Sequence, residues 1–272
     1  MNKNEDGKSN PYVGICIPAY EDVKLLQRAV DSILWQSYSN FRIYISDDSQ
    51  TTKIEEYIHA LNDRRIEYRH NSKTFGATEN TNQAIKMALD DNVDLIKIFY
   101  QDDWFTYNNS LLIMVQALIT NDADVLFSGN IEKGNEETFH ICTDSEIALL
   151  NRNITCLFKA NYLGAPSNIL YKKCDTLLDS RYEWLLDVDF YIRLIGDKKL
   201  SYVYEPLITI GHDGNQLSDF YYRNPYKMFI EKLNYYLGNK QIRNVSNFFY
   251  LLDYFILCTK ICIRNRREAH FG

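Results

Sequence analysis

The 272-residue sequence lacks several patterns that would assign it quickly to a protein class. Its six cysteines form no C-x-x-C pair, and no histidine or second cysteine pair completes a zinc set. The first eleven residues, Met1 to Pro11, are polar and contain no apolar signal-peptide core, and no run of eighteen uncharged apolar residues is present. We therefore expect a cytoplasmic protein with reduced thiols, a disordered segment over residues 1–11, and no ordinary transmembrane helix.

The sequence also lacks a net positive charge. Lys and Arg total 30 against 36 Asp and Glu, which gives a formal net charge of −6. Proteins that bind nucleic acid usually present a basic face, so we expect no nucleic acid partner. The hydrophobic fraction of 46% and the charged fraction of 24% are ordinary for a folded protein, and the length suits one large α/β domain with a small appendage.

Glycine is missing where a dinucleotide-binding dehydrogenase needs it, directly after the first predicted strand, Tyr12–Ile17. The turn there is Pro18-Ala19-Tyr20-Glu21. No glycine-rich basic loop for a triphosphate lies near the N-terminus, which argues against a nucleotidyltransferase. A phosphate-accepting signalling domain would place its acidic pair after the first strand, whereas the first acidic pair here follows the second.

The pattern that is present is an alternation of strands and helices. Strands are predicted at Tyr12–Ile17, Phe41–Ile45, Arg65–Arg69, Val93–Phe99, Ala123–Phe127, Asn168–Tyr171 and Val203–Gly211, and helices at Val23–Trp35, Thr51–Leu61, Ala77–Leu89, Ser110–Thr120 and Trp184–Ile195. We expect Pro18 to end the first strand and Pro206 to break the last. Residues 131–163 read as an irregular excursion. The alternation predicts an α/β fold whose mostly parallel sheet is flanked by helices.

Two acidic pairs follow predicted strands directly: Asp47-Asp48 after the second and Asp102-Asp103 after the fourth. Ligands bind at the carboxyl ends of strands in such sheets, so the two pairs should meet at one edge. Mg²⁺ and Mn²⁺ prefer carboxylate oxygens, and such an ion can stabilise charge on a diphosphate leaving group. The alternative is a solvated turn, where Asp is common.

Asp187 and His212 are two further candidates. Asp187 begins a helical segment crowded by apolar neighbours, so partial burial would raise its pKa and suit a general base. It could equally be a charge favoured by the helix dipole. His212 lies in a Gly-rich loop and could bind a metal or a phosphate, although a lone loop histidine is more often unliganded.

Taken in order, these segments resemble the motifs of the family-two, GT-A-type glycosyltransferases, which make bacterial cell-surface glycans. The matching segments are Ile15–Glu21 (ICIPAYE), Ala29–Tyr38 (AVDSILWQSY), Ile43–Ser49 (IYISDDS), Gly76–Ile85 (GATENTNQAI), Tyr100–Asp103 (YQDD) and Leu185–Leu194 (LLDVDFYIRL). The resemblance covers about residues 12–218, and Gly164–Ser167 loosely resembles a segment near the donor sugar. It implies a GT-A catalytic domain over residues 12–220, with a nucleotide-sugar half at 12–130 and an acceptor half at 131–220.

The resemblance also implies roles for individual residues. Pro18, Ala19, Tyr20 and Glu21 would line the nucleotide pocket, with Asp48 on the base, Asp47 beside it, and Asp102 at the ribose or phosphates. Asp103 would bind Mn²⁺ or Mg²⁺, with His212 able to complete that site, and Asp187 would be the base of an inverting transfer. UDP is the expected nucleotide, with dTDP and GDP open, and the acceptor is a glycan or a lipid-linked sugar.

Three positions depart from the family pattern: Tyr100 replaces the first acid of the metal motif, Leu186 replaces a Glu, and Glu21 replaces an Asn. A non-catalytic relative that binds sugar nucleotides or scaffolds a complex is therefore the alternative function.

Residues 221–272 lie outside the resemblance and form an aromatic-rich segment that we expect to be helical. Within it, the apolar stretch Val245 to Ile263 carries a narrow polar stripe and is followed by Arg264, Arg266 and Arg267. Such a helix can lie on the inner face of a membrane, which would suit a lipid-linked acceptor. Packing on the catalytic domain or on a second subunit is the alternative.

Overall fold

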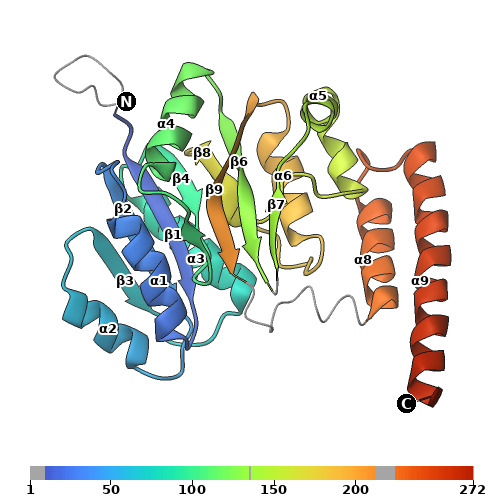
Figure 1. Ribbon diagram of the computed structural model, residues 1–272, viewed down its shortest axis with the longest axis horizontal. Coiled ribbons are helices and arrows are strands. Elements are labelled where there is room, and N and C mark those ends of the chain that lie inside the picture. Colours follow the sequence, from blue (N-terminus) through green and yellow to red (C-terminus); the bar gives the residue numbers. More distant parts are fainter. Residues whose placement is uncertain (1–9, 135, 212–223, 272) are drawn as a thin grey trace.

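A nine-stranded sheet organises the molecule (Figure 1). The structure is a computed structural model that describes residues 10–134, 136–211 and 224–271, with side chains described up to Cys262. The strands are β1 (Val13–Ala19), β2 (Phe41–Asp47), β3 (Ile66–His70), β4 (Leu95–Ile98), β5 (Trp104–Phe105), β6 (Val125–Lys133), β7 (Glu137–His140), β8 (Ile169–Lys172) and β9 (Leu200–Gly211). The helices are α1 (Val23–Leu34), α2 (Lys53–Leu61), α3 (Ala77–Asp90), α4 (Ser110–Thr120), α5 (Asp144–Arg152), α6 (Leu186–Ile195), α8 (Pro225–Gly238) and α9 (Val245–Phe271), with short 3-10 helices η1 (Ile154–Phe158) and η2 (Pro166–Asn168).

The strand order is β3-β2-β1-β4-β8-β6-β9-β5, with β7 paired to β6. The part formed by β3, β2, β1 and β4 is parallel, as the strand–helix alternation predicts. Beyond β4 the sheet is mixed, because β8 runs antiparallel to both β4 and β6, while β6 and β9 are parallel. The predicted α/β fold is thus confirmed, and its parallel character belongs to the N-terminal half.

Neither proline interrupts its strand, so both of these predictions were wrong. β1 continues through Pro18 to Ala19, paired with β2, because β4 stops pairing with β1 at Cys16 and the missing N–H of Pro18 costs no ladder bond. β9 continues through Pro206, which pairs with Gly129 where the β6–β9 register shifts. A bulge of this kind accommodates a residue without an N–H.

The segment predicted to be irregular, residues 131–163, contains regular structure. β6 extends to Lys133 and pairs with β7, and α5 and η1 follow. A capping box between Thr143 and Glu146 starts α5. Leu150 is the one fully buried residue of α5, so the apolar periodicity that would have predicted this helix is weak.

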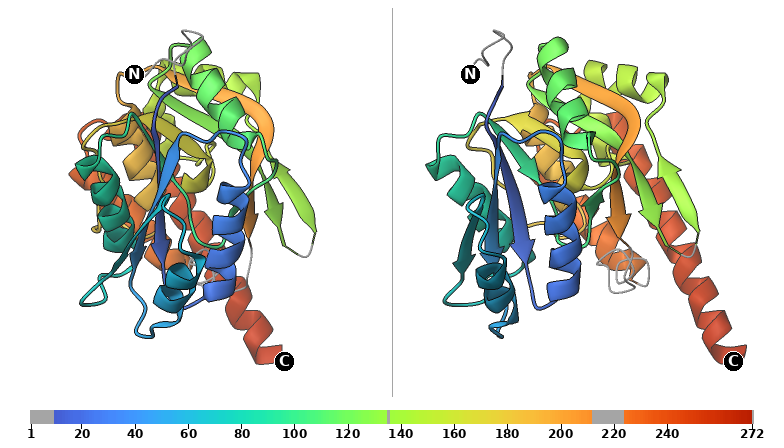
Figure 2. Two further views of the ribbon diagram at one scale, coloured as in Figure 1. Left: turned by 90° about the vertical axis from the view of Figure 1, so that its left-hand side faces the viewer. Right: turned by 60° about the vertical axis from the view of Figure 1, so that its left-hand side comes forward.

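Helices lie on both faces of the sheet (Figures 1 and 2), and a cluster of buried hydrophobic side chains covers each face. Alternate residues of β1 divide between them: Ile15 and Ile17 pack with α1, α2 and α4, whereas Cys16 packs with α3 and α6. The C-terminal helices and the turn between them join the cluster that contains Cys16, through Tyr235, Ile242 and Leu251. The C-terminal extension is therefore helical, as expected, and shares the core of the sheet.

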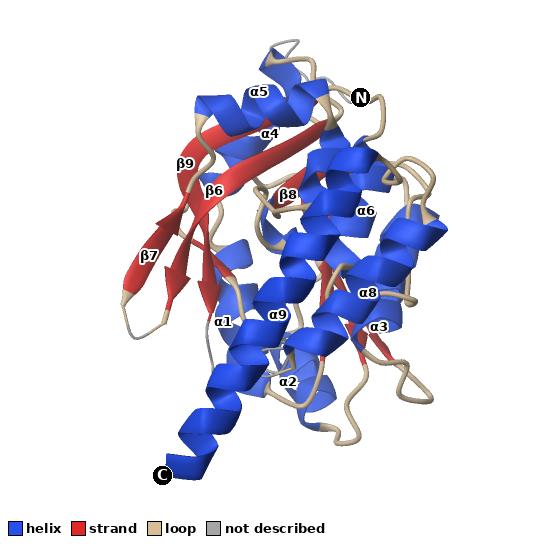
Figure 3. Ribbon diagram, turned by 90° about the vertical axis from the view of Figure 1, so that its right-hand side faces the viewer, coloured by secondary structure: helices blue, strands red, loops and turns tan. Residues whose placement is uncertain are grey.

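The helix α9 lies on the outside of α8, against which it packs (Figure 3). Its segment Val245–Cys262 is long and apolar enough to cross a membrane, and only 17% of that segment is buried.

Candidate active site

The two acidic loops lie on either side of the carboxyl end of β1. The Asp48 N–H donates to the Ala19 carbonyl at 3.0 Å, which ties the loop after β2 to β1. On the other side, the Tyr20 N–H donates to the Gln101 side-chain oxygen at 2.8 Å, and the Gln101 amide donates back to the Tyr20 carbonyl at 3.0 Å. The predicted meeting of both pairs at one edge of the sheet is therefore observed.

Asp47 and Asp48 are buried and hydrogen-bonded. Asp47 accepts a hydrogen bond from the Ser49 N–H at 2.8 Å and another from the Tyr68 hydroxyl at 2.7 Å. Asp48 accepts from the N–H groups of Phe75 and Gly76 at 2.9 and 2.8 Å, and from the Asn71 amide at 2.8 Å. These bonds fix the orientation of both carboxylates and hold the start of α3 against the end of β2.

The segment after β1 forms an open rim. The ring of Tyr20 is 51% exposed, and Glu21 has a left-handed backbone with φ of 54°. The Glu21 carboxylate accepts from the Gln50 N–H at 2.7 Å and from the Thr51 hydroxyl at 2.9 Å, and these bonds lower its pKa. Glu21 thereby holds the loop after β2 in place while leaving Tyr20 exposed.

Asp103 lies deeper, with 2% of its surface exposed. Its carboxylate accepts a hydrogen bond from the Gly211 N–H at 3.1 Å, at the end of β9. Burial raises the pKa of Asp103, and the neighbouring charge of Asp102 raises this pKa further. Two adjacent carboxylates in a poorly solvated place repel each other, and a divalent cation would relieve that repulsion. The donor set therefore fits Mg²⁺ or Mn²⁺.

The Asp102 backbone is held by Arg28 of α1, which donates to its carbonyl oxygen at 2.6 Å while stacking over the Trp104 ring at 4.1 Å. Gly211 approaches the same carbonyl so closely that an added Cβ would lie 2.2 Å from the oxygen. A side chain at position 211 would therefore force the end of β9 away from the loop that carries Asp102 and Asp103.

The Tyr100 hydroxyl lies near Asp187 as well as near Asp102 and Asp103. Burial is the largest cause that raises the pKa of Tyr100 well above its ordinary value, and the charges of Asp187, Asp103 and Asp102 raise this pKa further. Tyr100 belongs to the loop after β4, and Asp187 to the first turn of α6. The structure thus brings the candidate base to the candidate metal loop, although 84 residues separate Asp103 from Asp187 in sequence.

Asp187 is partly buried, and removal from water raises its pKa to about 7. Within the described part of the chain, no residue hydrogen-bonds its carboxylate. A carboxylate with this pKa accepts a proton readily near neutral pH, and it is free to bond an incoming hydroxyl.

Sequence reasoning missed Lys97, a fully buried lysine in the middle of β4. Its ammonium group donates to the Ser167 carbonyl, and Ser167 in turn accepts from the Tyr100 N–H at 2.9 Å. Burial lowers the pKa of Lys97, and the charge of Asp103 opposes this effect. The sequence signal that could have indicated this buried lysine is a single lysine between apolar residues of the predicted strand (LIKIF).

His212, the other predicted metal ligand, lies outside the described residues. It directly follows Gly211, whose N–H bonds to Asp103. Among the described residues, no group of three or more His, Cys, Asp or Glu side chains is arranged to hold a metal ion. Asp102 and Asp103 are the two carboxylates carried by the loop after β4.

Known proteins share this sequence pattern and fold. WcaA of Escherichia coli (strain K12), which is named as a colanic acid biosynthesis glycosyl transferase, is 36% identical over 118 residues, 42% of this chain and 41% of that protein. The glycosyltransferase GlyG of Streptococcus pneumoniae serotype 4 is 27% identical over 116 residues, 42% of this chain and 37% of its own length. The matched part is thus about two fifths of each relative.

Two solved structures show the same fold. TarS (residues 1–349) of S. aureus in complex with UDP-GlcNAc superposes with a TM-score of 0.61 at 16% identity, covering 82% of this chain and 67% of the 1–349 chain in that structure. The mannosyltransferase PcManGT of Pyrobaculum calidifontis, in complex with GDP-Man and Mn²⁺, gives a TM-score of 0.66 at 11% identity, covering 97% of this chain and 76% of PcManGT. The family model described as Glycosyl transferase family 2 matches residues 14–175, more than half of the sequence, and the chain therefore belongs to glycosyl transferase family 2.

Proposed function

We propose that this chain transfers a sugar from a nucleoside-diphosphate-sugar donor, most simply a UDP-sugar, to a hydroxyl group of a cell-surface glycan acceptor. The observation that carries the proposal is that Asp102 and Asp103, after β4, and Asp187, in the first turn of α6, lie near enough to Tyr100 for all three charges to act on its hydroxyl. The reaction is a single displacement that inverts the anomeric configuration.

The donor lies along the rim after β1. Pro18, Ala19, Tyr20 and Glu21 line the nucleotide, Asp47 and Asp48 lie beside the base with their orientations fixed by their hydrogen bonds, and Asp102 faces the ribose or the phosphates. Asp103, completed by His212, would hold Mn²⁺ or Mg²⁺. When bound, the ion supplies positive charge to the departing diphosphate.

Asp187 accepts the proton of the acceptor hydroxyl as that oxygen attacks the anomeric carbon. Three features support this role: its position in the first turn of α6 near Tyr100, its lack of a hydrogen-bond partner among the described residues, and a pKa of about 7. A base with a pKa near the working pH is both ionised and able to take up the proton.

The names of related proteins support the same chemistry. The structures with the same fold were determined with UDP-GlcNAc in one case and GDP-Man and Mn²⁺ in the other. WcaA is named for colanic acid biosynthesis, which supports the choice of a cell-surface glycan. The nucleotide proposed here is UDP, and dTDP and GDP are the competing choices.

Thermal shift with UDP, dTDP, GDP and CMP, each with and without Mn²⁺, tests the donor site. Binding to the folded state raises the melting temperature. We expect one diphosphate to shift it in the presence of Mn²⁺, and Asp103→Ala to lose the shift, whereas Asp197→Ala, at an exposed position after α6, keeps it. If no nucleotide shifts the wild-type protein, the proposal fails and a non-catalytic role as a scaffold, suggested by Tyr100 and Leu186, replaces it.

The exposed face of α9 supports a peripheral contact with the cytoplasmic face of a membrane. Its apolar side chains recur at helical spacing and are 44–72% exposed: Val245, Phe248, Phe249, Leu252, Phe255 and Ile256. Arg264, Arg266 and Arg267 follow in sequence and complement anionic lipids. Flotation with anionic liposomes at low salt tests this contact, and a protein that stays in the soluble fraction contradicts it.

A further inference from the structure

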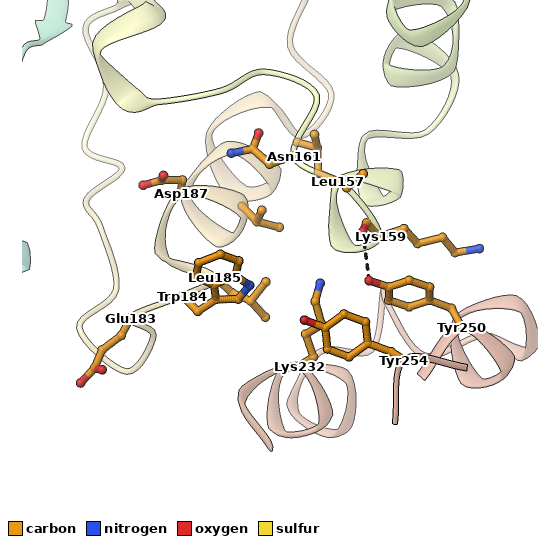
Figure 4. Close-up of a pocket in the computed structure, with 12 residues that line it drawn as sticks. Leu157, Lys159, Asn161, Glu183, Trp184, Leu185, Asp187, Lys232, Tyr250 and Tyr254 are labelled. Atoms are coloured by element: carbon orange, nitrogen blue, oxygen red, sulfur yellow. Dashed lines mark hydrogen bonds between the residues drawn. The ribbon is translucent and has the colours of Figure 1, made fainter. Parts of the chain in front are cut away.

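A cavity of about 490 Å³ lies next to the candidate base, on the side of α6 that faces the C-terminal helices (Figure 4). Its walls come from four parts of the chain that are distant in sequence: the end of η1, the first turn of α6, α8 and α9. Asp187 is at its edge, with a carboxylate that points away from Lys232 and the cavity centre. The cavity therefore borders the helical turn that carries the candidate base.

Lys232 supplies a positive charge to this cavity. The residue is only 5% exposed, yet its ammonium group points into the space between Leu185 and Tyr254 (Figure 4). It donates one hydrogen bond, to the Phe158 carbonyl at 2.7 Å, and lies 5.4 Å from the centre of the Tyr254 ring. In the described part of the chain it forms no ion pair.

The other charged groups of the lining do not cancel this charge. Lys159 and Glu183 point out of the cavity in Figure 4, and Glu183 pairs with Lys227 at 3.1 Å. Glu231 is near Lys232, but its carboxylate accepts hydrogen bonds from the Glu183 and Leu185 N–H groups at 2.9 and 2.8 Å. Burial lowers the pKa of Lys232 to about 8, and the charge of Glu231 opposes this effect, so the cavity retains a buried cation at neutral pH.

One further feature suits a glycan. Trp184, Tyr250 and Tyr254 present aromatic surfaces that sugar rings can pack against. The cation and the aromatic rings together form a site for an acidic sugar.

We propose that this cavity binds the acceptor glycan, and that the acceptor carries an anionic group, a phosphate ester or a carboxylate, bound by Lys232. The inference rests on the proposed glycosyl transfer and names its acceptor class. The acceptor extends from the cavity to Asp187, with the charged unit at Lys232 and the hydroxyl that is glycosylated at the carboxylate.

NMR of the full-length wild-type protein tests the inference without a transfer reaction. Glucose 1-phosphate, glucuronate and uncharged methyl glucoside are each titrated to about 10 mM, which detects millimolar binding. We expect at least one anionic sugar to shift the Trp184 indole and the Asp187 amide resonances, and methyl glucoside to leave them unchanged. The more effective anion identifies the group as phosphate or carboxylate. Equal shifts with the neutral sugar, or no shift with either anion, overturn the proposal.

Variants test whether Lys232 supplies the charge that binds the anionic sugar. Lys232→Met should weaken binding of the anionic sugar about tenfold to a hundredfold, the loss expected for a charge-assisted hydrogen bond. Lys159→Met is the matched control, because this lysine lines the same cavity and points out of it, and Lys232→Arg should retain binding. Wild-type affinity in Lys232→Met contradicts the inference. If Lys232→Met does not fold, the titrations of the wild type and of Lys232→Arg still test whether the cavity binds an anionic sugar.

The donor assay separates this inference from the function on which it rests. If anionic sugars bind the cavity but no nucleotide binds the protein, the acidic-glycan site is supported and the proposed transfer reaction is contradicted. If a nucleotide binds but no anionic sugar does, the proposed donor site is supported and the proposed acceptor class is contradicted.

Discussion

Substituting alanine for Gly211 tests how the metal loop is held. The added Cβ would lie 2.2 Å from the Asp102 carbonyl oxygen and 2.9 Å from the Arg28 guanidinium, so the end of β9 or the loop must move. Overpacking of this kind costs about 1–3 kcal/mol, which corresponds to about 2–10 °C in melting temperature. The same movement removes the hydrogen bond from the Gly211 N–H to Asp103. Mn²⁺-dependent UDP affinity should then fall about tenfold or more.

Thermal melts and UDP titrations with Mn²⁺ measure both effects. Gly238→Ala is the matched control, because nothing lies within 4 Å of its added Cβ and the same change there should leave stability equal or higher. The reasoning is refuted if Gly211→Ala melts and binds like the wild type. It is also refuted if melting falls while Mn²⁺-dependent affinity does not change, since the loop would then be independent of β9.

The other predictions concern the base, the buried lysine and the outer helix. Because burial raises the pKa of Asp187 to about 7, kcat/KM should rise as the pH passes through about 7, and Asp187→Asn should lower it about 10²–10⁴-fold and remove that rise. The unfolded chain ionises this carboxylate at its ordinary pKa of 3.8, whereas burial raises the pKa in the folded protein to about 7, so the wild type loses stability as the pH rises between these two values. Asp187→Asn should therefore melt higher than the wild type at pH 8 and not at pH 4. Lys97 lowers the pKa of Asp103, so Lys97→Met should move Mn²⁺-dependent UDP binding to higher pH by about one unit, the effect of a ~1.4 kcal/mol interaction, while the exposed-pair control Lys86→Met should not. Phe249→Ser removes a side chain that is 59% exposed, so liposome binding should weaken about tenfold to a hundredfold while the melting temperature stays the same; equal flotation of variant and wild type would count against the α9 contact.

The N-terminal half could be predicted from sequence because each of its elements carries its own signal. The apolar runs of β1, β2 and β4 are buried on both faces, and α1 shows regular apolar spacing. The acidic pairs follow these strands directly, so their meeting at the sheet edge followed from topology alone.

The second half was harder because tertiary contacts shape it. The bulge that accommodates Pro206 exists only in the pairing of β9 with β6, and no local signal reports it. The two-residue strand β5 is defined by its partner β9. The cavity beside Asp187 joins η1 to α8 and α9, about ninety residues apart at Lys159 and Tyr250, so no spacing in the sequence could have predicted it.

Tyr100 is the most informative departure from the family pattern. A carboxylate at this position would add a fourth negative charge beside Asp102, Asp103 and Asp187, in a place where burial already raises the pKa of Asp103 and of Asp187. The tyrosine keeps hydrogen-bonding capacity at this point without that charge, and it stays neutral because its own pKa is raised. Lys97, behind the same loop, further offsets the negative charge of Asp103. Fewer carboxylates mean less repulsion in the free protein and a weaker intrinsic attraction for a divalent ion. The departure is therefore compatible with catalysis by a metal that binds mainly together with the donor diphosphate, whose oxygens supply the ligands that the protein does not.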